Sequence, residues 1–131
     1  MELLHKDLTE NLIRIFYDVY NELGHGFLEK VYQNAMYIEL KSRGYDVMPQ
    51  KQIKVHYKGN EVGEYYSDLI INDLIIIELK AKECLLEEHE AQLVNYLRAT
   101  DKEVGLLMNF GVKAQFIRKI FTNDQKKLKQ K

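Results

Sequence analysis

The sequence predicts an α/β fold in which a mixed β-sheet is flanked by helices. Apolar residues follow a helical spacing up to about residue 43, and the period changes to two from residue 47. The segment 74–80 is apolar on both faces, which is typical of a strand in the middle of a sheet that is covered on both sides. A helical segment separates it from the next apolar strand, and such a crossover places the two strands parallel.

Three helices are expected along the chain. Residues 7–23 carry apolar side chains at helical spacing, and Gly24 is a natural stop. A second helix is expected over residues 27–43, with Gly44 ending it. The third is expected over residues 87–99.

Five strands are expected in the remaining segments. In the first of them Ile53, Val55 and Tyr57 alternate with polar residues, the pattern of a half-buried strand. The expected strands are residues 47–57, 62–71, 74–80, 104–109 and 116–121, and residues 58–61 form the turn between the first two.

The composition is that of a soluble globular protein. The chain has 131 residues, with 46% hydrophobic and 30% charged residues, and the absence of a linker predicts one domain over residues 1–121. No apolar run approaches the ~18 residues of a membrane span. The N-terminus lacks the order of a signal peptide, and the single Cys84 cannot form an internal disulfide. We therefore expect a cytoplasmic protein without a membrane partner.

The charge is unevenly distributed along the chain. Residues 1–112 hold 12 Lys or Arg against 19 Asp or Glu, whereas residues 113–131 hold 7 basic residues against Asp124. The basic tail over residues 122–131 is expected to be frayed. With a net charge of −1, electrostatics give only weak support for a nucleic-acid partner.

Three charged residues interrupt the most apolar part of the sequence. Asp68 begins one strongly apolar run, and Glu78 and Lys80 end the next. An ionised side chain in an apolar interior costs several kcal/mol unless it is paired, hydrogen-bonded or bound to a metal. Glu78 and Lys80 lie two residues apart in a strand and therefore share a face.

Whether Asp68 joins that face depends on the turn between the strands. A two-residue loop would pair residue 71 with residue 74 and turn Asp68 away from Glu78. A three-residue loop over residues 72–74 would pair 71 with 75 and set the two carboxylates opposite each other, with Cβ atoms about 5 Å apart. Because Asn-Asp is not the signature of the tightest hairpin, we expect the longer loop or an equivalent bulge.

Two carboxylates at that separation repel each other unless a hard cation lies between them, and oxygen ligands of this kind suit Mg²⁺ or Mn²⁺. Lys80 could then hold the attacking water or a developing charge. The alternative is a buried structural salt bridge between Lys80 and one of the acids. The spacing alone leaves both interpretations open.

The acid at position 68, followed after nine residues by Glu78-Leu79-Lys80, resembles the signature of the PD-(D/E)XK nuclease superfamily, although Ser67 stands where the name has proline. The segment 26–32 also fits the G-x-x-E-x-x-Y pattern of a small bacterial family assigned to that superfamily. The resemblance extends over roughly residues 5–121. It implies a restriction-endonuclease-like core of order αβββαβ, with the first helix as an addition.

The resemblance also implies roles for individual residues. Asp68, Glu78 and the carbonyl of Leu79 would bind the metal, and Lys80 would position the water. Glu29, on the helix before the sheet, would support that metal or a second ion. Without the resemblance, Glu29 is also explained as an acid favoured by the helix dipole.

Two residues of the third helix match a Q-x-x-x-Y element found in related nucleases. Gln92 and Tyr96 are four residues apart and share a face of the helix with His89. The resemblance implies that Gln92 and Tyr96 bind the substrate or orient the site, whereas a core tyrosine is the alternative. His25 resembles a metal-binding histidine of some relatives, and His89 is interpreted as a solvated or capping residue.

The function expected from these features is a Mg²⁺- or Mn²⁺-dependent phosphodiesterase acting on DNA. The alternative is a non-catalytic binding or assembly protein that retains the fold and its charges for structure. The mildly acidic charge favours this alternative. The small size leaves little surface to bind a duplex unless copies associate as a homo-oligomer.

Overall fold

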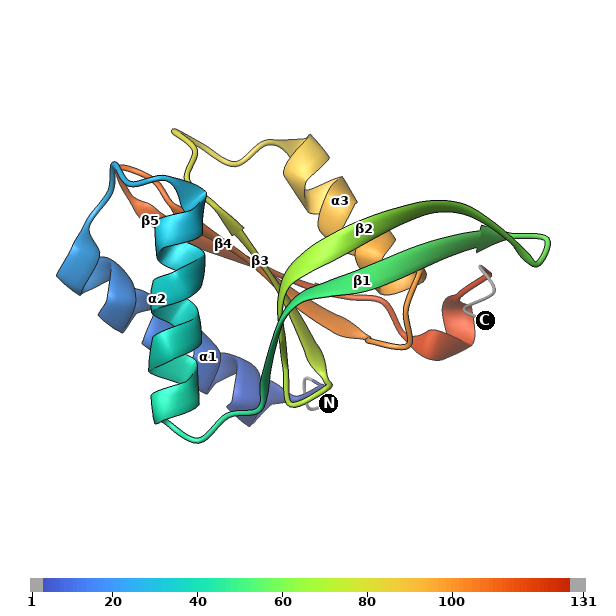
Figure 1. The fold of residues 1–131 in the computed structure, drawn as a ribbon, viewed down its shortest axis with the longest axis horizontal. Helices are drawn as coiled ribbons and strands as arrows, with labels where there is room; N and C mark the ends of the chain where they lie inside the picture. The colour runs from blue at the N-terminus through green and yellow to red at the C-terminus, as the bar shows by residue number, and fades with distance from the viewer. Residues whose placement is uncertain (1–3, 128–131) are drawn as a thin grey trace.

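The predicted mixed sheet is present in the computed structural model, which describes residues 4–127 (Figure 1). The five strands lie in the order β1-β2-β3-β4-β5; β3 and β4 are parallel and the other pairs are antiparallel. The α/β fold and the parallel crossover are therefore confirmed. The elements are α1 (Lys6–Leu23), α2 (Glu29–Ser42), β1 (Val47–Tyr57), β2 (Asn60–Ile71), β3 (Ile75–Lys80), α3 (Glu87–Arg98), β4 (Val104–Phe110), β5 (Ala114–Ile120) and a short 3₁₀ helix, Asn123–Gln125.

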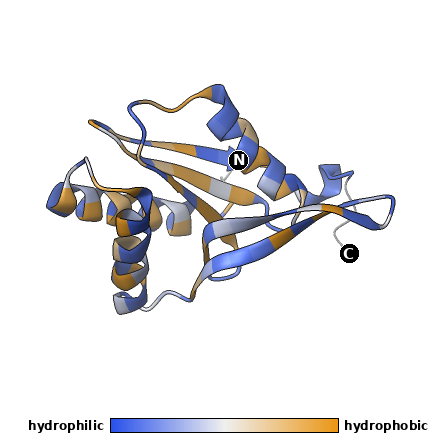
Figure 2. Ribbon diagram, turned by 45° about the horizontal axis from the view of Figure 1, so that its top comes forward, coloured by the Kyte–Doolittle hydropathy of each residue, from blue (hydrophilic) through white to orange (hydrophobic). Residues whose placement is uncertain are grey.

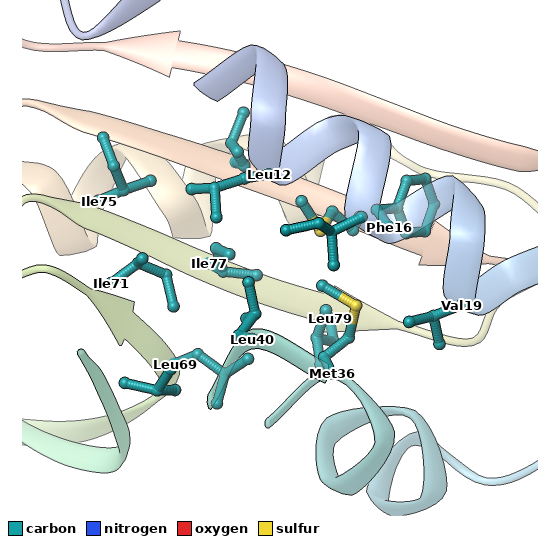
Figure 3. Packing of buried hydrophobic residues seen from close by; sticks show 14 of the residues in the cluster. Leu12, Phe16, Val19, Met36, Leu40, Leu69, Ile71, Ile75, Ile77 and Leu79 are labelled. Carbon is teal, nitrogen blue, oxygen red and sulfur yellow. The ribbon is translucent and has the colours of Figure 1, made fainter. Parts of the chain in front are cut away.

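Helices cover both faces of the central strands, which explains why β3 carries apolar side chains on both faces before Glu78 and Lys80. On one face Ile75, Ile77 and Leu79 of β3 pack in a cluster with side chains of α1 and α2 (Figure 3). On the other face Ile76 packs in a second cluster with Leu93 and other residues of α3. Figure 2 shows that the central strands are largely hydrophobic, whereas the tip of the β1–β2 hairpin is hydrophilic.

Some boundaries differ from the sequence prediction. Lys58 and Gly59 both have positive φ, 51° and 81°, so a two-residue turn lets β2 begin at Asn60 rather than at residue 62. The second helix begins at Glu29 rather than at residue 27, because Leu28 is still extended. The last strand begins at Ala114, two residues before the predicted start. The first residues of β5 show no strand pattern in the sequence, and their pairing with β4 defines where the strand begins.

The turn between β2 and β3 has the predicted three-residue loop. Ile71 pairs with Ile75, and the loop over residues 72–74 is closed by the Leu74 N–H, which donates to the Ile71 carbonyl at 2.9 Å. Asn72 and Asp73 adopt positive φ, 53° and 55°, which their residue types tolerate. Continued along the strands, this register sets residue 68 opposite residue 78.

Two interactions hold this loop in place from opposite sides. The backbone N–H of Asp46 donates to Asn72 Oδ1 at 2.9 Å, and the Asn72 N–H donates to the Asp46 carbonyl at 2.8 Å. On the other side Lys102 Nζ, nearly buried, lies 2.7 Å from Asp73 Oδ1. The loop that sets the register is therefore fixed to the rest of the fold.

The β1–β2 hairpin leaves the sheet as an arm (Figure 1). β2 pairs with β3 over only three residues, 69–71, whereas its pairing with β1 continues to the Tyr57–Asn60 pair at the tip. Beyond Leu69 the two strands of the arm therefore separate from β3 and open a fork between β2 and β3.

Part of the C-terminal tail that was expected to be frayed packs on the protein. Lys126 Nζ donates to the carbonyls of Thr100 and Lys102 at 2.8 and 2.6 Å. Residues 128–131 lie outside the described part of the chain. Among residues 4–127, no helix is both long and apolar enough to cross a membrane.

The position of α3 depends on a close approach to β4. A Cβ atom at Gly105 would lie 2.6 Å from Leu93 Cδ1. We expect Gly105→Ala to lower the free energy of unfolding by about 1–3 kcal/mol, because Leu93 must move within a packed core. Denaturant unfolding measures this. Gly63→Ala, where nothing lies within 4 Å, is the matched control, and equal stability of the two variants would contradict the close approach.

Candidate active site

At the fork between β2 and β3, a hydrogen bond to a side chain replaces the next backbone hydrogen bond of the sheet. The last backbone pair is Leu69 with Ile77, and beyond it the Leu79 N–H donates to Asp68 Oδ2 at 2.7 Å. In an antiparallel pair the N–H and C=O of one residue point to the same neighbouring strand. The Leu79 carbonyl therefore also points to the side that β2 has left, which is the side of Asp68.

Glu78 is almost completely buried beside Asp68. It is 5% exposed, and its Oε1 atom has no hydrogen-bond partner among the described residues. Burial raises the pKa of Glu78 to about 9, with a further contribution from the charge of Asp68. Burial also raises the pKa of Asp68, and the hydrogen bond from Leu79 opposes this. The predicted facing acids are therefore brought together, in a site that resists the ionisation of both.

Lys80 lies near the two acids without pairing with them. It is half-buried, and its positive charge lowers the pKa of both Asp68 and Glu78. Within residues 4–127 it forms no ion pair with either acid. The alternative of a direct structural salt bridge is thus not found in this part of the chain.

Glu29 is within electrostatic range of Asp68, and His25 is exposed. Glu29 is the first residue of α2, is half-buried, and its charge contributes to the raised pKa of Asp68. His25 lies in the loop before that helix. Across the described residues, no three His, Cys, Asp or Glu side chains gather into a metal-binding cluster. Neither Glu29 nor His25 therefore joins Asp68 and Glu78 as a close third ligand.

The third helix directs Tyr96 toward the acids. Tyr96 is 5% exposed, and its pKa is raised by burial and then by the charges of Glu78 and Asp68. A hydrogen bond with Gln92, one turn earlier, acts in the opposite direction. Tyr96 therefore lies within electrostatic range of the two carboxylates, and Gln92 is its hydrogen-bond partner. His89 has the capping role expected of it, since its Nδ1 accepts from the Leu86 N–H at 3.0 Å.

Gln33 contacts the site but was not singled out in the sequence. Its Nε2 donates to the Asp68 carbonyl at 3.4 Å, and its Oε1 accepts from Gln50 Nε2 at 3.1 Å. Gln50 has a positive φ of 52° within β1, in the position opposite Asp68. The signal available was weak: Gln33 follows Glu29 by four residues and so shares its face of the helix.

Asn109, also missed, fixes the chain just after the candidate site. It is fully buried at the end of β4, where its Oδ1 accepts from the Lys82 N–H at 2.9 Å and its Nδ2 donates to the Lys82 carbonyl at 3.0 Å. The lone amide in an otherwise apolar strand was the available signal. These two hydrogen bonds hold the chain just after the C-terminal end of β3, and with it Lys80, against β4.

The donor atoms at the fork suit a hard divalent cation. The Asp68 and Glu78 carboxylates and the Leu79 carbonyl offer only oxygen, the donor that Mg²⁺, Mn²⁺ and Ca²⁺ prefer. The unpartnered Glu78 Oε1 is a buried acceptor without a donor, and a cation would satisfy it. These residues therefore fit a metal of this class.

Without metal, the buried acid should destabilise the protein at alkaline pH. Because the folded pKa of Glu78 exceeds its unfolded value, the unfolded state releases its proton first, and stability falls as the pH rises from about 4.5 to about 9. Glu78→Gln should raise the free energy of unfolding at pH 8 by about 2 kcal/mol and leave it nearly unchanged at pH 4.5. Chemical denaturation with a chelator measures this. The exposed Glu83→Gln is the control, and identical pH profiles for both variants would refute the assignment.

Comparisons with known proteins agree with this fold. The solved structure of SSO0001 has a TM-score of 0.58 and 19% identity to this chain; the match covers 73% of this chain and 51%, about half, of that protein. This likeness shows the fold. A search of curated proteins finds no match. The family model described as the PD-(D/E)XK nuclease superfamily matches residues 6–120, and the chain therefore belongs to the PD-(D/E)XK nuclease superfamily.

Proposed function

We propose that this protein is a metal-dependent nuclease that hydrolyses phosphodiester bonds in DNA. The observation that carries the proposal is the pair of adjacent acids, Asp68 and Glu78, at the fork beside Leu79, with a buried carboxylate oxygen left without a partner. In a member of this superfamily, such an arrangement of oxygen donors is best explained as a site for a divalent cation.

The residues at the fork have two different roles, metal binding and stabilisation of the reacting groups. Asp68, Glu78 and the Leu79 carbonyl hold Mg²⁺ or Mn²⁺, which when bound polarises the phosphate and makes water more acidic. Lys80, which pairs with neither acid in the described part of the chain, orients the attacking water or stabilises the charge that develops on the phosphate.

The remaining predicted residues act around this centre. Glu29 supports the first ion or a second one through its charge, since it lies within electrostatic range of Asp68. Gln92 and Tyr96 contact the substrate; the electrostatic influence of both acids on Tyr96 and its hydrogen bond with Gln92 support this role. His25 is a further ligand only if the exposed loop before α2 moves toward the fork. We expect the protein to act in the cytoplasm of a bacterium as a member of the G-x-x-E-x-x-Y family.

A non-catalytic binding or assembly protein is the second candidate. Two observations favour it: the net charge of −1 gives little attraction to a phosphate backbone, and no close third ligand joins the acids within the described residues. Association of copies as a homo-oligomer would enlarge the surface available to a duplex. The following experiments distinguish turnover from binding.

Cleavage should depend on Mn²⁺ and on two residues at the C-terminal end of β3, Glu78 and Lys80. We expect the wild type to cut labelled single- or double-stranded DNA with Mn²⁺, and Glu78→Ala and Lys80→Ala to cut it at least about 100-fold more slowly, because each removes a group that stabilises the transition state. Glu83→Ala, purified identically, should retain full activity. No cleavage by the wild type, or equal cleavage by all variants, would favour the binding protein.

Metal binding should also be visible as stabilisation. At about 100 times its Kd, Mn²⁺ should contribute about 2.7 kcal/mol and raise the Tm by a few degrees. The shift should be larger at pH 8 than at pH 6, because both acids must lose their protons to bind, and Asp68→Asn should abolish it. Calcium should stabilise without supporting cleavage. A Tm that is unaffected by either metal at both pH values would exclude the site.

A further inference from the structure

An exposed aromatic ring lies next to the candidate site. The rings of Tyr65 and Tyr96 pack with their centroids 5.1 Å apart and their planes tilted by 54°. Tyr96 is buried and lies within electrostatic range of the acids, whereas Tyr65, on β2 in the arm, is 43% exposed. The two tyrosines therefore form an aromatic step that leads from Asp68 and Glu78 to solvent.

A hollow lies next to the aromatic step, because Ile53, the cross-strand partner of Tyr65, lines it. Tyr65 pairs across the strands with Ile53, and both pack toward α3. Ile53 also lines a hollow of about 840 Å³ between β1 and the loop after α3, together with Lys51 and Lys54. Lys54 pairs with Glu61 at 3.6 Å, whereas Lys51 has no ion pair among the described residues. Lys102, in the same hollow, pairs with Asp101, so Lys51 is the lysine of the hollow that has no acidic partner in the described part of the chain.

The charge of the chain limits how a nucleic acid can be held. Phosphate contacts supply most of the affinity of basic nucleic-acid-binding proteins, but this chain has a net charge of −1. Stacking of a base on an aromatic ring is largely independent of charge and contributes substantially for each base. It requires an unpaired base, because the faces of a paired base are covered by its neighbours in the duplex.

We propose that Tyr65 is a stacking platform for an unpaired base of the substrate, next to the scissile phosphate. The inference rests on the proposed nuclease function for the site it adjoins, and it names the substrate class as single-stranded nucleic acid or a frayed duplex end. Lys51, in the neighbouring hollow, contacts a flanking phosphate. If the ring served only to cover Tyr96, any apolar side chain of similar size could replace it.

The neighbouring residue supplies a matched control. Tyr66 is 51% exposed, on the same strand and of the same type, but adjacent residues of a strand point to opposite faces. Its hydroxyl accepts from Gln52 Nε2 at 3.4 Å, away from Tyr96. A variant at position 66 therefore reproduces the chemical change of a variant at position 65 without touching the aromatic step.

The experiment uses the absence of tryptophan from the chain. Tyr65→Trp and Tyr66→Trp each introduce a single fluorescent reporter, which is titrated with a short thymidine oligonucleotide and with an abasic oligonucleotide of equal length in the presence of a chelator. Stacking should quench the reporter at position 65 with the thymidine strand only, and should leave the reporter at position 66 unchanged. In parallel, Tyr65→Leu should weaken binding of the labelled oligonucleotide about 10-fold, measured by fluorescence anisotropy, and Tyr66→Leu less than twofold.

The outcomes separate this inference from the proposed nuclease function. Quenching at position 65 with a selective loss in Tyr65→Leu supports the platform, even if the Mn²⁺ assay shows no cleavage and the nuclease proposal fails. Cleavage with equal binding by Tyr65→Leu and Tyr66→Leu overturns the platform and leaves the nuclease intact. Equal quenching by the abasic strand, or no binding of the oligonucleotide to the wild type, also overturns it.

Discussion

The register of the β2–β3 hairpin is the constraint on which the candidate site depends. A shift of one residue would turn Asp68 to the opposite side from Glu78, since side chains alternate along a strand. The loop over residues 72–74 prevents this shift: two residues with positive φ close it, and bonds to Asp46 and Lys102 hold it from both sides. Only with that register do the two acids meet at the point where β2 leaves β3.

The arrangement of the acids costs stability in the metal-free protein. A buried carboxyl with an unpartnered oxygen and a raised pKa would ordinarily be replaced by an apolar side chain, as at Ile76 on the same face of the same strand. The charge on Lys80 reduces this cost without cancelling it, because within residues 4–127 Lys80 forms no ion pair with either acid. Such uncompensated acids cluster at functional sites more often than in structural cores.

The sequence predicted the elements whose periodicity is strong and whose partners are near in the chain. The helices, the parallel crossover and the three-residue loop follow from apolar spacing, from glycine positions and from the turn residues around Asn72. Long-range contacts could not be predicted from the sequence. Gln33 donates to the Asp68 carbonyl from the helical layer, whereas a glutamine on a helix ordinarily faces solvent. Tyr65 and Tyr66 are equivalent in the sequence, and only the packing on Tyr96 distinguishes them. The roles of Gln92 and Tyr96 came from the family resemblance, because four-residue spacing alone also describes a core tyrosine.

The end of the backbone pairing between β2 and β3 explains how Asp68 can serve both the fold and the candidate site. Where β2 leaves β3, the Leu79 peptide loses its backbone partner, and a buried N–H without an acceptor would be destabilising. Asp68 satisfies that N–H, so the carboxylate is held by the defect that the fork creates. The carbonyl of Leu79, which belongs to the next peptide group, is left facing the same gap. Completing the ladder would therefore stabilise the sheet while removing an oxygen donor and the opening through which the arm and its aromatic step approach the acids.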